Sequence, residues 1–426
     1  MAEPFRTVAP GGTEILIEHL PQVRSVSLGF WVRRGSRHEA AHEEGLAHFL
    51  EHTVFKGTAR YPTQDAVAEA TDRLGGHVDA FTGKEVACFY GRVLADQLPE
   101  LAELLGELVT TPRFDGEELA RERGVILEEI AMSEDQPDDW VSELFYMDFW
   151  KDSPLAHPIL GRRDQVASYG AEAARAFFES TYRAGNLVIS AAGAVTPETL
   201  LPLLAPILAK LPAGGEETMK AAAKSAAATR PFLLNAPKKG LQQTNLVLGF
   251  PAPSHTDRDR AAVGLLSHIL GGGMASRLFL ELRERRGLCY QVGSYHTPYA
   301  DTGALQISAG CAPAQARELV ARTMAECLKL RSQLVPEEEL ERARRQAKVS
   351  LVFGQESASS RMFSLAHQAL HWGGPVSLDA QLAELDAVTP EDLRRLADAI
   401  LRPEALGLAA LGIPKAHGIR ASDLVA

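Results

Sequence analysis

Cysteine is scarce in this chain of 426 residues, and its distribution excludes two classes of protein. The four cysteines, Cys88, Cys289, Cys311 and Cys327, are scattered and include no C-x-x-C pair. Disulfide-stapled secreted domains and thiolate zinc sites both need clustered cysteines. We therefore expect four reduced thiols that pack as small apolar side chains.

Long apolar runs are also absent. No stretch approaches the roughly 20 apolar residues that a membrane-spanning helix needs. The first residues, Met1-Ala2-Glu3-Pro4-Phe5-Arg6, do not form a basic segment followed by an apolar one, as a secretory signal would. We expect no membrane-spanning segment and a cytoplasmic location.

An excess of positive charge is the third feature that is missing. Lysine and arginine number 44 against 55 aspartates and glutamates, which gives a formal net charge of -11. Nucleic-acid-binding domains are usually basic, so we expect no nucleic-acid partner and a mild preference for basic partners. The apolar content of 46% is ample for sizeable cores, and the length suggests about two or three domains.

The stretch His48-Phe49-Leu50-Glu51-His52 carries the clearest chemistry. Its apolar neighbours favour a helix, in which positions 48 and 52 lie one turn apart on the same face. Two such imidazoles can bind one zinc ion, and Glu51 is close enough to take a proton from a water at that ion. The order H-x-x-E-H inverts the H-E-x-x-H metalloprotease signature. An ordinary helix face remains the alternative, because five residues alone do not decide between the two.

A second helix, predicted from about 115 to 130, places two more carboxylates on one face. With a period of 3.6 residues, Glu122, Val125, Ile126 and Glu129 form a single stripe. A carboxylate buried beside apolar side chains needs a metal or hydrogen-bond donors. Glu128 falls on a neighbouring stripe that looks solvated, so Glu129 is the better third ligand. Taken without the histidine motif, a pair of exposed helix carboxylates is the simpler interpretation.

The first half of the chain reads as mixed helices and strands. Strands are expected at 14–18, 25–32 and 186–193, and a hairpin at 77–82 and 86–94. The stretch 216–229 is low in complexity and lacks aromatic residues, which is typical of a linker. It separates a catalytic domain at 1–215 from a second domain at 230–426.

The second half repeats this order without the candidate ligands. Strands are expected at 232–236, 243–250, 288–296 and 303–310, with helices at 257–270 and 276–286. Aligning 264–271 with 45–52 puts Ser267 at the position of His48, Leu270 at that of Glu51 and Gly271 at that of His52. Aligning 337–343 with 116–122 puts Ser350 at the position of Glu129. We predict an α+β fold of two similar domains, each with a mostly antiparallel sheet and flanking helices.

Taken together, these motifs resemble the pitrilysin-like zinc peptidases of family M16. The resemblance is closest to the processing peptidases of about 420 residues, which include the β subunit of mitochondrial processing peptidase and its bacterial relatives. It covers nearly the whole chain, and the third ligand lies 77 positions after the second histidine (129 minus 52), as in the family. The matching stretches are Gly35-Ser36-Arg37, Gly45 to His52, Phe55-Lys56-Gly57-Thr58, Ala80-Phe81-Thr82, Glu122 to Glu129 and Leu282 to Tyr290.

For the site, the resemblance implies one zinc ion per chain, bound by His48, His52 and Glu129. It implies that Glu51 is the general base and that Glu122 contacts a ligand without binding the metal. These implied roles agree with the two helix patterns.

The resemblance also assigns residues that no pattern singles out. Arg283 and Tyr290 match an arginine and a tyrosine that reach the zinc site of a facing domain and hold the substrate and the tetrahedral intermediate. Without the family, they would be read as a solvated arginine and a core tyrosine. Asp79, Ala80 and Phe81 match an edge strand that pairs with the bound peptide. The family usually has asparagine at Asp79, so the role of that one side chain is open.

The function implied is a zinc-dependent endopeptidase that cleaves peptides or unfolded protein segments inside a chamber. Family members build the chamber from four such domains, so a chain with two domains is expected to form a homodimer; a heterodimer with a related chain is the alternative. A different function, a non-catalytic structural or substrate-binding subunit, also occurs among relatives. Such subunits typically lack one or more ligands, whereas this chain has them all.

Overall fold

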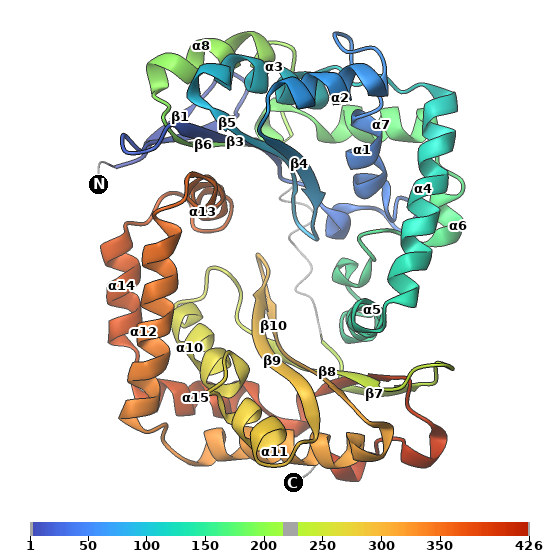
Figure 1. Cartoon of the computed structure of the whole chain (residues 1–426), viewed down its shortest axis with the longest axis vertical. Helices are drawn as coiled ribbons and strands as arrows, with labels where there is room; N and C mark the ends of the chain where they lie inside the picture. The colour runs from blue at the N-terminus through green and yellow to red at the C-terminus, as the bar shows by residue number, and fades with distance from the viewer. Residues whose placement is uncertain (1–2, 216–228, 425–426) are drawn as a thin grey trace. The chain divides into compact units, whose positions relative to one another are not determined.

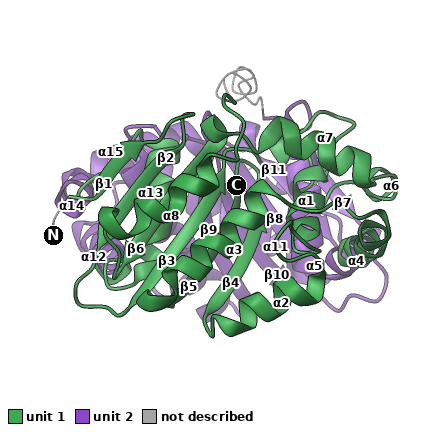
Figure 2. Ribbon diagram, turned by 90° about the horizontal axis from the view of Figure 1, so that it is seen from above, with its two compact units in different colours: residues 1–131, 157–225, 352–377 green, residues 132–156, 226–351, 378–426 purple. Residues whose placement is uncertain are grey.

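The structure is a computed structural model that describes residues 3–215 and 229–424 (Figure 1). The chain divides into two compact units, each made of three segments (Figure 2). Unit 1 comprises 1–131, 157–225 and 352–377, and unit 2 comprises 132–156, 226–351 and 378–426. The predicted linker at 216–229 lies almost entirely outside the described residues.

Unit 1 is built on a six-stranded sheet with the order β1-β2-β6-β3-β5-β4. β2 and β6 run parallel, and every other neighbouring pair is antiparallel. The alternating apolar residues of β3 and β5 place Phe30 and Phe89 in the core, and β4 forms one edge of the sheet. The strands are β1 (Phe5–Val8), β2 (Glu14–His19), β3 (Ser25–Val32), β4 (His77–Thr82), β5 (Ala87–Leu94) and β6 (Leu187–Gly193).

Helices cover both faces of this sheet (Figure 1). The larger core, on one face, buries apolar side chains of α1, α3, α7 and α8. On the other face, Met362 and Leu365 of α13 pack with Leu16 and Val188. The helices are α1 (Leu46–Val54), α2 (Gln64–Arg73), α3 (Leu98–Thr110), α4 (Gly116–Asp135), α6 (Arg163–Val166), α7 (Ala171–Thr181), α8 (Pro197–Leu208) and α13 (Ala358–His371).

Unit 2 repeats the same strand order in a five-stranded sheet, β7-β11-β8-β10-β9. β7 and β11 run parallel, as β2 and β6 do, and the remaining pairs are antiparallel. β9 forms the edge that corresponds to β4 in unit 1. The strands are β7 (Phe232–Ala236), β8 (Thr244–Ala252), β9 (Cys289–Pro298), β10 (Gly303–Cys311) and β11 (Gly407–Leu411).

The helices of unit 2 also lie on both faces of its sheet. The main core buries side chains of α10, α11, α12 and α15, whereas Phe145 and Phe149 of α5 pack on the other face against Val247 and Ala409. The helix predicted at 276–286 contains a π-helix, η5 (Phe279–Glu284). The α-helices are α5 (Pro137–Phe149), α10 (Arg260–Gly271), α11 (Ala316–Ser332), α12 (Glu337–Gly354), α14 (Leu378–Ala387) and α15 (Pro390–Ile400).

The predicted α+β fold with two similar, mostly antiparallel sheets is confirmed. The limits of the two functional domains stay a prediction. The two compact units exchange one helix each: α5 comes from the first half of the chain but belongs to unit 2, whereas α13 comes from the second half but belongs to unit 1. All four cysteines are buried and unpaired with one another, as expected. Among the described residues, no helix is long and apolar enough to cross a membrane.

Candidate metal centre

The helix that carries the histidine motif is anchored at its first turn by a buried carboxylate. Glu39 accepts hydrogen bonds from the backbone N–H groups of Gly45 (2.8 Å) and Ala47 (2.7 Å), which lack partners inside α1. Gly45 has φ +92°, a conformation that favours glycine, and a Cβ there would lie 2.6 Å from the Cα of Gly161. The start of α1 is therefore fixed, and His48 and His52 follow one turn apart with ring centroids separated by 4.6 Å.

The helix α4 supplies the carboxylates, with one difference from the predicted stripe. Glu122 and Ile126 are buried, and Glu129 lies at the edge with 43% of its side chain exposed. Val125, predicted to share the buried face, is 53% exposed, so that part of the prediction was wrong. The buried face is centred on Glu122 and Ile126, which puts Val125 beyond its rim. Glu128 is exposed, as expected.

His48, His52 and Glu129 come together, with one ligand atom from each within 4.8 Å of the others. The Glu129 Oε2 atom lies 3.7 Å from His48 Nε2 and 3.5 Å from His52 Nε2. Ligands at 2.0–2.2 Å from one tetrahedral zinc ion are separated by roughly 3.4 Å, so these distances fit such an ion. Two imidazoles and one carboxylate are also a donor set of catalytic zinc sites.

A chain of contacts behind His52 sets the direction of its ring. His52 Nδ1 lies 2.7 Å from Glu122 Oε1, and Lys56 Nζ lies 2.5 Å from Glu122 Oε2. With the proton on Nδ1, His52 donates to Glu122, and the Nε2 lone pair is left for a metal. Burial raises the pKa of Glu122, but the hydrogen bonds from His52 and Lys56 outweigh it and lower that pKa.

The two histidines differ in electrostatic environment. Burial lowers the pKa of His48 to about 3, and the neighbouring His52 acts in the same direction, so the His48 imidazole is held in its neutral form. Burial also acts against the charged form of His52, but the hydrogen bond to Glu122 and the nearby carboxylates prevail and raise its pKa. His48 Nδ1 is buried and has no hydrogen-bond partner among the described residues.

Glu51 lies on the same helix and has a partner that the sequence patterns did not single out. Thr82 Oγ1, at the end of β4, donates a hydrogen bond of 2.5 Å to Glu51 Oε2. Burial raises the pKa of Glu51, and the hydrogen bond from Thr82 partly offsets that effect. Thr82 and Lys56 stand inside the stretches that match the family, whereas Glu39 stands outside them.

Comparison with known proteins identifies the family. The family model "Insulinase (Peptidase family M16)" matches residues 14–163, and "Peptidase M16 inactive domain" matches residues 168–347. An uncharacterised zinc protease of Streptomyces coelicolor is 36% identical over 408 residues, covering 93% of this chain and 87% of that protein. This chain belongs to peptidase family M16.

Other relatives of this M16 chain agree in length and fold. The uncharacterised zinc protease YmxG of Bacillus subtilis is 34% identical over 394 residues, covering 92% of this chain and 94% of the relative. The crystal structure of a protease from Helicobacter pylori shares the fold, with a TM-score of 0.86 and 20% identity, covering 96% of this chain and 100% of that one. A crystal structure of an M16 inactive domain from Pseudomonas fluorescens has a TM-score of 0.85 at 22% identity, covering 97% and 99% of the two chains.

The predicted substrate strand of this M16 chain is the edge strand β4. Among the described residues, β4 pairs only with β5, which leaves one side of its backbone unpaired. Asp79 accepts hydrogen bonds from the Ala80 N–H (2.8 Å) and from the hydroxyl of Tyr90 (3.4 Å). Phe81 packs edge-on against Trp31, with ring centroids 5.8 Å apart. A free strand edge is what β-augmentation requires, and the role of β4 in substrate binding stays a prediction.

Arg283 and Tyr290 lie in unit 2, whereas the other predicted site residues lie in unit 1. The Arg283 guanidinium carbon is 4.7 Å from the ring centroids of both Phe279 and Tyr290. The β9–β10 register pairs Gly310 with Gln291 and Cys311 with Cys289, so Tyr290 is the extra residue of a β-bulge. Tyr290 is 77% exposed and is therefore not a core tyrosine.

Proposed function

We propose that this chain is a zinc-dependent endopeptidase that cleaves peptides or unfolded protein segments. The observation that carries the proposal is the convergence of the His48, His52 and Glu129 ligand atoms on one point, with Glu51 on the same helix as the two histidines. The names of the zinc proteases among its relatives agree with it.

His48, His52 and Glu129 would hold the zinc ion. A bound zinc ion supplies Lewis acidity, which polarises a carbonyl group and makes water a stronger acid. Glu122 and Lys56 orient His52 from behind, and such partners typically change metal affinity when they are removed.

Glu51 is the proposed general base. Its burial raises its pKa toward the working range of a base that must take up a proton and release it again. Glu51 would take a proton from the attacking water and later deliver it to the leaving amine, so that it returns to the carboxylate form.

The substrate would bind as an added strand at the free side of β4. Main-chain hydrogen bonds to an edge strand hold a peptide without requiring a particular sequence. This mode fits extended or unfolded segments, and Asp79, Ala80 and Phe81 are the proposed contact residues.

Arg283 and Tyr290 are proposed to hold the substrate carbonyl and the oxyanion that develops on it. The Arg283 guanidinium stacks on the ring of Tyr290, which is exposed to solvent. We propose that the chain forms a homodimer enclosing the substrate in a chamber, with each zinc site completed by Arg283 and Tyr290 of a second copy.

The deciding experiment is cleavage of an unstructured, basic, internally quenched peptide by the wild type and by Glu51→Gln, with bound zinc quantified in each. We expect zinc in both proteins and cleavage only by the wild type. Cleavage by Glu51→Gln at near the wild-type rate would refute the role of Glu51. Zinc in both without cleavage by either would refute an autonomous peptidase and favour a heterodimer or a binding subunit, and no zinc in either would refute the site itself.

Two further measurements test the contribution of unit 2. Tyr290→Phe should lower kcat, whereas Tyr295→Phe, on the same strand, should not.

Mixing Glu51→Gln with Arg283→Ala should restore part of the activity if two copies share their sites. Complete failure of this complementation in a mixture shown to form dimers would argue against shared sites.

A further inference from the structure

Thr82 connects two parts of the proposed machinery that are far apart in sequence. It is the last residue of β4, the strand with a free edge, and its hydroxyl donates to Glu51 on α1 at 2.5 Å. Within residues 3–215 and 229–424, this is the hydrogen bond that the Glu51 carboxylate receives, and it involves Oε2 alone.

The turn that follows Thr82 is fixed by the loop that precedes α1. The Ser36 N–H donates to the Gly83 carbonyl (3.1 Å), and the Arg37 N–H donates to the Lys84 carbonyl (2.9 Å). Ser36 and Arg37 are both buried. Because the two residues after Thr82 are held by backbone hydrogen bonds, the backbone that carries the Thr82 side chain is fixed in place.

The hydrogen bond from Thr82 makes the two carboxylate oxygens of Glu51 different from each other. Oε2 is held by Thr82, so Oε1 is the oxygen left to take up a proton. A carboxylate that rotates freely would present its lone pairs in many directions. A carboxylate held at one oxygen presents the lone pairs of its other oxygen in a narrow range of directions.

We propose that Thr82 is a positioning residue that orients Glu51 for proton transfer and ties it to the strand on which the substrate lies. The inference rests on the proposed peptidase function. A peptide added to β4 is located by the backbone that also carries Thr82, so the scissile bond and the base are placed by the same strand. Thr82 itself keeps its proton throughout the reaction.

The test compares Thr82→Val, which has nearly the same shape but no hydroxyl, with Thr82→Ser, which keeps it. Valine is favoured in strands, so the variant should fold. We expect bound zinc and KM to stay unchanged, kcat of Thr82→Val to fall about 10- to 100-fold, and Thr82→Ser to recover most of the loss, as for a hydrogen bond to a charged group. Thr297→Val is the matched control, because Thr297 lies on β9, the edge strand of the other sheet, and donates to Gln306 at 3.1 Å.

An unchanged kcat in Thr82→Val, an equal loss in Thr82→Ser, or a loss of zinc in either variant would overturn the proposal. Crystal structures of the wild type and Thr82→Val, prepared without added metal, supply a readout that does not need activity. We expect the Glu51 carboxylate to hold its place only in the wild type, and an identical Glu51 position in both would refute the inference. Failure of the wild type to cleave any peptide would refute the proposed function, and the crystal structures would still decide whether Thr82 positions Glu51.

Discussion

The helix pairs α1–α4 in unit 1 and α10–α12 in unit 2 occupy corresponding places in two sheets of the same strand order, yet only one pair has the side chains for metal chemistry. The aligned positions that hold His48 and His52 in unit 1 hold Ser267 and Gly271 in unit 2. Ser267 is buried and shares a hydrogen bond of 3.1 Å with Ser294 of β9. The fold therefore does not need the ligands.

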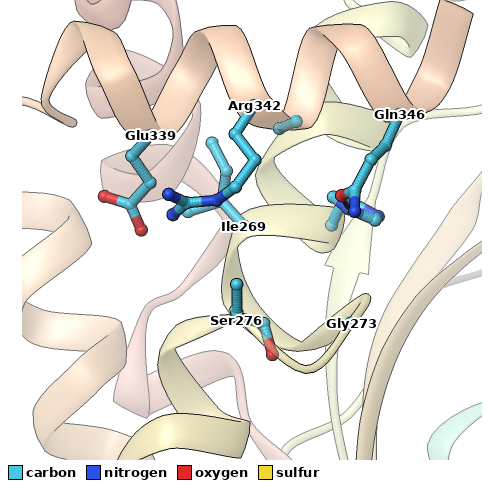
Figure 3. Close-up of a pocket in the computed structure, with 9 residues that line it drawn as sticks. Ile269, Gly273, Ser276, Glu339, Arg342 and Gln346 are labelled. Atoms are coloured by element: carbon cyan, nitrogen blue, oxygen red, sulfur yellow. Dashed lines mark hydrogen bonds between the residues drawn. The ribbon is translucent and has the colours of Figure 1, made fainter.

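In unit 2, α10 packs directly against β9 at Gly271, the position that corresponds to His52. A Cβ at Gly271 would lie 2.6 Å from the backbone nitrogen of Ser294, so α10 lies too close to β9 for a histidine at that position. Figure 3 shows Glu339, Arg342 and Gln346 of α12 projecting toward α10 around a pocket. The comparison teaches that the helix pair is a structural element of the fold, and that the chemistry in unit 1 depends on the few side chains placed between the helices.

Removing a ligand from unit 1 should have the largest effect. His52→Ala takes away one of the three proposed metal ligands, so we expect zinc to be lost and peptide cleavage to fall by about three orders of magnitude or more. Metal analysis after dialysis, together with the rate on a quenched peptide, measures both effects.

Ser267→Ala in unit 2 is the matched change for this experiment. It should leave the zinc content and the cleavage rate as in the wild type, at a cost of about 1 kcal/mol in stability for the lost hydrogen bond. A variant His52→Ala that keeps its zinc, or a Ser267→Ala that loses it, would break the contrast between the two helix pairs.

Loss of the contact behind His52 should have a smaller effect. Glu122→Gln keeps the shape of the side chain but loses the charge that lies between His52 and Lys56, and we expect zinc affinity to fall about 10- to 100-fold. Competition with a coloured chelator measures this. Glu117→Gln, on the same helix with 91% of its side chain exposed, is the control and should leave the affinity unchanged. Equal affinities in the wild type and Glu122→Gln would show that His52 needs no such partner.

Two glycines of α10 test the packing of unit 2. Gly271→Ala should destabilise the protein by about 1–3 kcal/mol, because the added Cβ meets the backbone of β9. Gly264→Ala, on the same helix with nothing within 4 Å of the added Cβ, should stabilise it by about 0.5–1 kcal/mol. Thermal unfolding in the presence of a chelator measures both without any contribution from bound zinc.

Opposite signs for the two glycine variants are the expected outcome. If Gly271→Ala were as stable as Gly264→Ala, α10 would have room to move away from β9. The absence of ligands from unit 2 would then have no steric cause.

The metal centre was more predictable from the sequence than its supports. The spacing of His48 and His52 follows from helix geometry alone, and the stripe on the second helix favoured Glu129, in agreement with the resemblance to M16 peptidases; the structure brings the Glu129 carboxylate to both histidines. Thr82 contacts Glu51 across 31 residues of sequence, and Glu39 reaches the start of α1 from a loop residue six positions before Gly45, so no helix or strand periodicity could pair either of them with α1. The exchange of α5 and α13 was unpredictable for the same reason, because an amphipathic helix does not specify which sheet it covers.

The last contrast is between the carboxylates at the first turns of α1 and α10. Glu39, at the start of α1, is buried, and its burial raises its pKa to about 8, with Glu43 acting in the same direction and Arg34 and two backbone N–H groups against it. Asp259, at the start of α10, is partly exposed, and its pKa is lowered by the hydrogen bond from Arg395. The two carboxylates should therefore affect stability in different pH ranges.

The folded protein keeps the proton of Glu39 between its ordinary pKa of 4.5 and about 8, whereas the unfolded chain releases it. The stabilisation from Glu39 is present below pH 4.5 and is lost as pH rises toward 8, with a slope of up to about 1.4 kcal/mol per pH unit. Glu39→Gln should flatten the fall in stability between pH 5 and pH 8, measured by thermal unfolding with a chelator present. Asp259→Asn should leave the fall in stability between pH 5 and pH 8 unchanged. Because the pKa of Asp259 is lowered, the stabilisation from Asp259 is lost only at acid pH, where its carboxylate takes up a proton. An identical pH profile for the wild type and Glu39→Gln would mean that the carboxylate at the start of α1 is charged in the folded protein, held by its two backbone donors.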